Sequence, residues 1–83
     1  MAGRTEWIPV EISDGMFSNE YAVNIKTAEG RQVSLFADKE LIREEKDRAF
    51  LKVLCISLQN GIRTVLLPSE TFETLTRWVN VAT

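Results

Sequence analysis

The sequence predicts a mainly β protein, in which five to six short strands form a small curled antiparallel sheet or a partly closed barrel. The first observation behind this prediction is that short apolar or alternating runs recur along the 83 residues and are separated by turn residues. The second is Asn60-Gly61, which lies between two apolar runs. A type I′ turn needs positive φ at both central residues, which Asn and Gly adopt most readily, so these runs are predicted to form a hairpin. We expect a single domain (1–83), with no regular structure in residues 1–5.

The composition narrows the class of protein. With 45% hydrophobic and 27% charged residues, the chain has the balance of a soluble globular domain. A net charge of −2 argues against a general phosphate-binding surface. Histidine is absent and Cys55 is the single cysteine, which excludes an intrachain disulfide and a Cys–His zinc site. No apolar stretch approaches the roughly 18–20 residues that span a bilayer. We therefore expect a cytoplasmic protein with no membrane segment, metal or cofactor.

The first strand is predicted over residues 6–12, where apolar side chains alternate with others. Pro9 cannot donate a backbone hydrogen bond, so we expect this strand to lie at an edge of the sheet, at least on the Pro9 side. Residues 13–20 are predicted to form a long loop that carries Met16 and Phe17. These two side chains either plug the open end of the sheet or contact a partner.

Residues 21–37 are predicted to form a second hairpin, whose register follows from a comparison of loop lengths. A two-residue loop would mix apolar and polar side chains on each face. A three-residue loop, 28–30, pairs Ile25 with Val33 and leaves one face apolar and the other mostly polar, as a one-sided antiparallel sheet requires. Gly30 then holds the third loop position, which commonly adopts the left-handed conformation.

A charged connection, residues 38–48, leads to the strand 49–59. Nine of its eleven residues are charged, and only Leu41 and Ile42 are apolar, so we expect an exposed segment with one helical turn at most. The strand 49–59 is apolar on both faces, which predicts a strand that is central or covered on both sides. We expect either a curled sheet or the C-terminal segment to cover its second face. Its expected partners across the Asn-Gly turn are Ser57–Thr64, Ile56–Val65, Cys55–Leu66 and Leu54–Leu67.

The C-terminal residues 69–82 fit two interpretations. Ser69 can cap a helix, and Phe72, Leu75 and Val79 would then share one helical face. The other interpretation is a helical turn followed by a strand, which the β-branched residues of this segment favour. A full helix would give an α+β fold, in which it covers a five-stranded antiparallel sheet. The mainly β fold instead contains only a short C-terminal helix or helical turn.

The expected strand count and the long first loop resemble those of SH3-like and Tudor-like barrels, a resemblance that concerns architecture alone. The residues give little support for catalysis. Cys55 lies in mid-strand among apolar neighbours, where a thiol serves as a small hydrophobic side chain. Serine and cysteine nucleophiles lack a histidine base, and no glycine-rich phosphate loop is present. The chain is therefore expected not to be an enzyme, and no small-molecule substrate is inferred.

Recognition remains as the expected function. We expect a small non-catalytic protein-interaction module that binds a protein partner or a second copy of itself. The candidate partner-binding residues are Trp7, Met16, Phe17 and Phe36. Phe36 falls on the polar face of its hairpin, either as a contact under the charged connection or as an exposed anchor, and Trp7 and Trp78 would cover one another if the first and last strands pair. The alternative is a nucleic-acid-associated or transcription-regulatory small protein, which the acidic charge balance disfavours.

Overall fold

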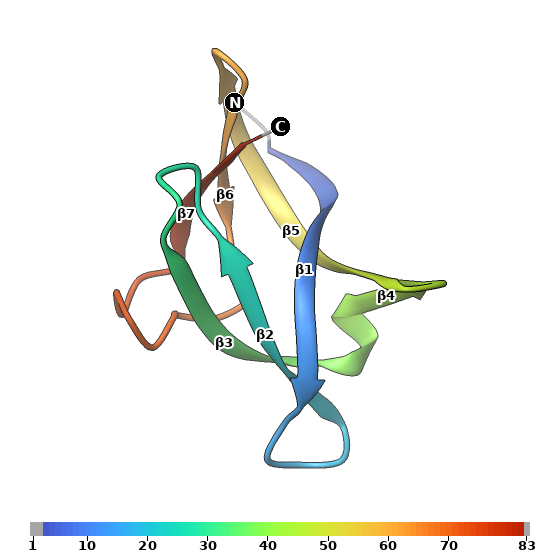
Figure 1. Ribbon diagram of the computed structural model, residues 1–83. Helices are drawn as coiled ribbons and strands as arrows, with labels where there is room; N and C mark the ends of the chain where they lie inside the picture. The colour runs from blue at the N-terminus through green and yellow to red at the C-terminus, as the bar shows by residue number, and fades with distance from the viewer. Residues whose placement is uncertain (1–2, 83) are drawn as a thin grey trace.

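The computed structural model describes residues 3–82 and consists of a seven-stranded antiparallel sheet that curls into a half-open barrel (Figure 1). The strand order is β3-β2-β1-β5-β6-β7. The strand β4 lies outside this order and pairs with β5, on the same edge as β6. This architecture confirms the predicted mainly β class. The elements are β1 (Arg4–Asp14), β2 (Glu20–Lys26), β3 (Gln32–Asp38), the 3-10 turn η1 (Lys39–Leu41), β4 (Ile42–Glu45), β5 (Arg48–Gln59), β6 (Ile62–Leu66) and β7 (Trp78–Ala82).

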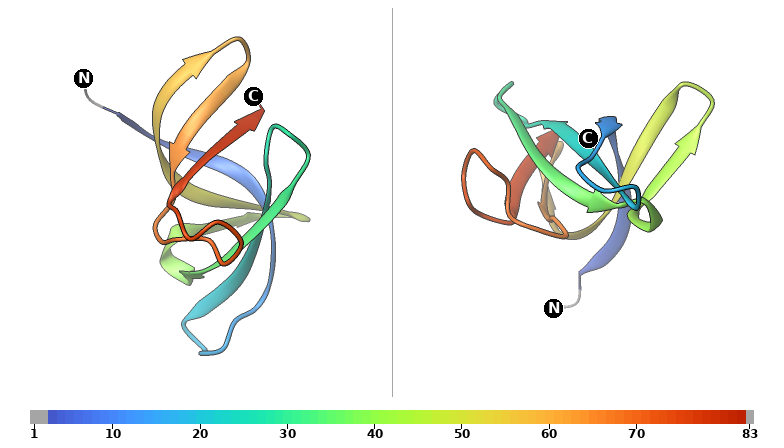
Figure 2. Two further views of the ribbon diagram at one scale, coloured as in Figure 1. Left: turned by 90° about the vertical axis from the view of Figure 1, so that its left-hand side faces the viewer. Right: turned by 90° about the horizontal axis from the view of Figure 1, so that it is seen from below.

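The curl arises because β1 and β5 are long and change partners along their length. Residues 4–10 of β1 pair with β5, whereas residues 11–14 pair with β2. The view from below shows the resulting open ring (Figure 2, right). The seam between β3 and β7 is crossed by two backbone hydrogen bonds, Ala28 N to Asn80 O at 2.8 Å and Phe72 N to Ser34 O at 2.9 Å.

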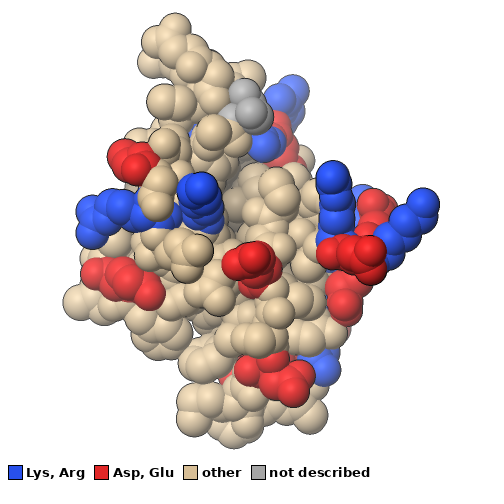
Figure 3. All heavy atoms as spheres, viewed as in Figure 1, with Lys and Arg blue, Asp and Glu red and all other residues tan. Residues whose placement is uncertain are grey.

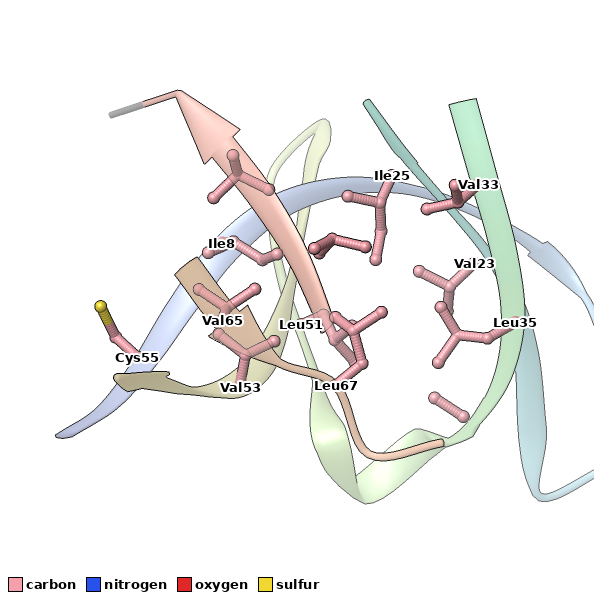
Figure 4. Close-up of a cluster of buried hydrophobic side chains, with 13 residues drawn as sticks. Ile8, Val23, Ile25, Val33, Leu35, Leu51, Val53, Cys55, Val65 and Leu67 are labelled. Atoms are coloured by element: carbon pink, nitrogen blue, oxygen red, sulfur yellow. The ribbon is translucent and has the colours of Figure 1, made fainter. Parts of the chain in front are cut away.

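The core lies on the concave face of the sheet. Side chains from β1, β2, β3, β5, β6 and β7 point toward one another there (Figure 4). Burial of this apolar face from water is the main free-energy gain of the fold. The fully buried members with the largest side chains are Ile8, Val23, Ile25, Leu35, Leu51, Val65 and Leu67, with the polar Thr71.

The β2–β3 hairpin has the predicted register. Ile25 lies opposite Val33, and the pairing continues without interruption to Glu20 opposite Asp38. The loop closes with the Thr27 N to Arg31 O hydrogen bond, and Gly30 has a φ of 88°. Loop length and side-chain alternation were sufficient to define this hairpin.

The β5–β6 hairpin has the predicted turn but only part of the predicted register. Asn60 and Gly61 both have positive φ, 54° and 77°, as a type I′ turn requires. Ser57 pairs with Thr64 as expected. A register shift between Cys55 and Ser57 then makes the other three expected pairs wrong. The observed pairs are Cys55–Val65 and Leu54–Leu66.

Three further expectations need correction. Residues 1–5 were expected to lack regular structure, but β1 begins at Arg4, while residues 1 and 2 lie outside the described part of the chain. The edge expected at Pro9 is local: Pro9 pairs with Phe50 on one side, and β2 starts pairing only at Glu11 on the other. As a whole β1 lies inside the sheet. The charged connection contains the expected turn, η1, but also the strand β4. The sequence did not predict this strand because most of its side chains are charged.

The C-terminal segment follows the turn-plus-strand interpretation. Within it the Leu75 N to Thr71 O hydrogen bond closes one helical turn, and β7 follows from Trp78. The helix-covered α+β alternative is therefore wrong. Threonine hydroxyls bond to one another within the turn, Thr71 to Thr74 at 2.5 Å and Thr74 to Thr76 at 3.0 Å, which competes with a continuous helix.

Candidate interaction surfaces

The loop between β1 and β2 holds Met16 and Phe17 in the open. The two side chains are 74% and 67% exposed, so they do not plug the sheet. The loop is ordered by hydrogen bonds at its base, from Glu20 N to Phe17 O and from Met16 N to the Glu20 carboxylate. It projects beyond the strands at the lower end of the molecule (Figure 1). An ordered loop thus presents an apolar tip that the fold does not use.

The other two candidate residues are half-buried and lie elsewhere. Phe36, on the outer face of β3, packs edge-on against Phe72 with ring centroids 5.4 Å apart. It is therefore covered by the C-terminal turn and not by the charged connection. Trp7 lies on the outer face of β1, with the Arg43 guanidinium 4.4 Å from its ring centroid. The strands β1 and β7 are not neighbours, so the condition under which Trp7 and Trp78 would cover one another is not met.

An apolar surface on the outer face of β5, β6 and β7 was missed from the sequence. Leu54, Leu66 and Trp78 lie opposite one another across the three strands, and Leu54 and Trp78 are 37% and 56% exposed. The strand β5 is central in the sheet, as one form of the expectation had it, but the expected cover of its second face is wrong: the curled sheet covers only the concave face. The doubly apolar pattern of residues 49–59 is the sequence signal for this surface, but the pattern alone does not distinguish a buried second face from an exposed one.

A groove of about 240 Å³ adjoins this apolar row. It arises from the topology of β5, since β4 pairs with residues 48–51 and β6 with residues 54–59 on the same edge. Within residues 3–82, no strand pairs with the β5 backbone between these two ranges on that edge. The side chains that line the groove are Thr5, Leu41, Lys52, Val53, Leu54, Leu66, Leu67, Pro68 and Arg77.

The charges around the groove are basic. Among the described residues, Lys52 and Arg77 are the charged ones that line it, and Arg77 is held in place by the Nε donation to Leu67 O at 2.9 Å. Lys52 pairs with Trp7 across the sheet, and the Arg43 guanidinium lies over the Trp7 ring. Arg43 is therefore a third cation near this border of the groove. Within residues 3–82, none of these three cations forms an ion pair with a carboxylate.

Elsewhere the carboxylates are used within the fold. Glu6 pairs with Arg63 and with Arg4, and hydrogen bonding to Arg63 lowers the pKa of Glu6. The Tyr21 hydroxyl donates to the Glu44 carboxylate at 2.8 Å, which raises the pKa of Tyr21 above its ordinary value of 10.0. These contacts tie strands together, since they join β1 to β6 and β2 to β4.

Cys55 is buried at the margin of the core (Figure 4), as expected for a structural thiol. In the described range 3–82, no three His, Cys, Asp or Glu side chains are grouped so that they could hold a metal ion.

Comparisons with protein-family models, with curated proteins and with solved structures found no match to this chain. Among the described residues, no helix has the length and apolar character needed to cross a membrane.

Proposed function

We propose that the protein is a small non-catalytic protein-interaction module and that the tip of the β1–β2 loop is its contact surface. The observation that carries this proposal is the exposure of Met16 and Phe17 on a loop that hydrogen bonds hold in shape. Aromatic and methionine side chains are enriched at the cores of protein interfaces. A preformed loop also loses little conformational entropy when it binds.

The charged side chains around the loop indicate what kind of surface a partner would present. Asp14 and Glu20 flank the apolar tip, and Asp38 lies opposite Glu20 on β3, with Lys39 as the basic neighbour. Acidic side chains lie beside this loop in the lower part of Figure 3. The matching surface on a partner is an apolar depression bordered by Lys or Arg, because complementary charges favour encounter and exclude wrong partners. The lone free thiol of Cys55 supports a reducing compartment such as the cytoplasm.

The test is the substitution Phe17→Ala, with Leu58→Ala as the matched control. Both side chains are exposed, but Leu58 lies on the β5–β6 hairpin, away from the loop. Phe17→Ala should weaken binding by more than about 1 kcal/mol, as expected for an interface anchor, and leave the melting temperature nearly unchanged. Self-association is measured by sedimentation, and partner capture by affinity purification of the tagged protein. A lower melting temperature with unchanged binding would show that Phe17 serves the fold.

A further inference from the structure

We propose that the groove on β5 receives the β1–β2 loop of a second copy, so that two chains exchange loops in a closed dimer. This inference rests on the proposed function of the loop and names its partner. Three features of the described residues support it: the chemistry of the groove, the chemistry of the loop, and their positions relative to one another.

The groove has the chemistry that the loop requires. Its walls are apolar, with Leu41 on one side and Leu66 and Pro68 on the other, and its charged members are Lys52 and Arg77. At about 240 Å³ it is smaller than the roughly 300–1,000 Å³ of sites that hold drug-sized ligands. A depression of this size suits one or two apolar side chains.

The loop has the complementary chemistry. Met16 and Phe17 provide the apolar tip, and Asp14 lies exposed beside it. The Glu20 carboxylate accepts a hydrogen bond from Met16 N, which leaves Asp14 as the loop carboxylate best placed to meet a cation outside its own chain. Charge complementarity between Asp14 and the basic border of the groove thus accompanies the apolar match.

The positions of the loop and the groove favour a closed dimer. Lys39 N donates to Asn19 O at 2.9 Å, which ties the end of the loop to η1. Leu41, the last residue of η1, lines the groove. The short turn η1 thus contacts the loop at one end and lines the groove at the other. Two copies related by a two-fold axis can then place both loops in both grooves at once, and such isologous contacts close the assembly at two chains.

The experiment exchanges charges between the two surfaces. Asp14→Lys and Lys52→Glu each place like charges together in both contacts of a homodimer. Each variant alone should dimerise at least about tenfold more weakly than the unmodified chain, as measured by sedimentation equilibrium. In an equimolar mixture, one contact of the heterodimer is native and the other has both charges reversed. The mixture should therefore recover dimerisation. Glu29→Lys, on the β2–β3 loop, is the control and should dimerise normally.

The possible outcomes separate this inference from the proposed function. Phe17→Ala, which changes no charge, should also dimerise more weakly than the unmodified chain, and melting temperatures show whether each variant is folded. A monomeric unmodified chain, or a mixture that stays monomeric, overturns the loop-exchanged dimer. If Phe17-dependent binding of another protein persists in that case, the proposed function stands. Loss of all Phe17-dependent binding overturns both.

Discussion

The two hairpins of the sheet use the same antiparallel pairing but differ on their outer faces. On β2–β3 the outer side chains are small or polar apart from Phe36. The C-terminal turn contacts two of them: Phe72 packs on Phe36, and Glu73 accepts hydrogen bonds from Ser34. On β5–β6 the outer side chains Leu54 and Leu66 are apolar, and no segment within residues 3–82 covers them fully. A segment of the chain itself thus contacts the first outer face, whereas the second is left partly exposed.

The hairpins also differ in regularity. The β2–β3 ladder is continuous over seven pairs, whereas the β5–β6 ladder shifts register between Cys55 and Ser57. A bulge increases the local twist and changes which side chains share a face. Here it allows Cys55 and Val65 to face the core while Leu54 and Leu66 face outward. The comparison teaches that the apolar side chains of β5–β6 lie on both faces of the hairpin, buried in the core on one face and partly exposed on the other.

The largest effect should separate the two faces of β5. Leu51 is 0% exposed in the core, and Leu54 lies three residues away on the outer face. Leu51→Ala should lower the free energy of unfolding by about 2–5 kcal/mol, because it leaves a cavity in a packed core. Leu54→Ala should lower it by less than about 1 kcal/mol. Denaturant unfolding of both variants measures the difference, and similar losses would show that the outer face is part of the core.

The next effect compares the two turns. Asn60 and Gly61 both hold positive φ, whereas the β2–β3 loop has one such residue, Gly30. The double change Asn60→Ala and Gly61→Ala should cost about 1 kcal/mol or more at each site, because a β-carbon is strained in the left-handed region. Gly30→Ala should cost about 1 kcal/mol, since a β-carbon there would have no neighbour within 4 Å and only the backbone strain remains.

Thermal unfolding ranks the three proteins. The expected order of melting temperature is the unmodified chain, then Gly30→Ala, then the Asn60-Gly61 double variant. If the double variant melts within about 2 °C of the unmodified chain, the type I′ turn contributes little and the comparison of the hairpins is wrong.

The fold class, both hairpins and the turn at residues 60–61 were predictable from the sequence. The register was predictable for one hairpin and only partly for the other, and the difference has a physical reason. In β2–β3 one face is polar, so a shift of one residue would bury polar side chains, and only one register is acceptable. In β5–β6 both faces are apolar, so alternation places no comparable constraint on register. The bulge at Cys55–Ser57 was therefore missed.

Of the candidate surfaces, the loop was predictable from the sequence and the groove was not. Met16 and Phe17 interrupt a polar loop, and this contrast identified them as candidates. The groove depends on which residues of β5 pair with β4 and which pair with β6, and this pairing is a property of the tertiary structure. Nothing local to Leu41, Lys52 or Arg77 marks these residues as neighbours.

The smallest effect concerns the cover of the β2–β3 outer face. The Ser34 backbone N and hydroxyl donate to the Glu73 carboxylate at 2.7 and 2.6 Å, and these hydrogen bonds lower the pKa of Glu73 below its ordinary value of 4.5. A carboxyl group whose pKa is lower in the folded state stabilises the fold above its unfolded pKa. This contribution is lost as the pH falls through the folded pKa.

Glu73→Gln should therefore destabilise the protein slightly at neutral pH, with a smaller difference in acid. Melting temperatures of both proteins from about pH 7 to about pH 3 should converge as the pH falls, because protonated Glu73 no longer offers a charged acceptor to Ser34. Glu70→Gln, on the same segment, is the control, since within residues 3–82 its carboxylate accepts no side-chain or backbone hydrogen bond. A constant gap between Glu73→Gln and the unmodified chain at all pH values would mean that the charge of Glu73 does not hold the turn on β3. The contrast between a covered hairpin and an open one would then depend on Phe72 alone.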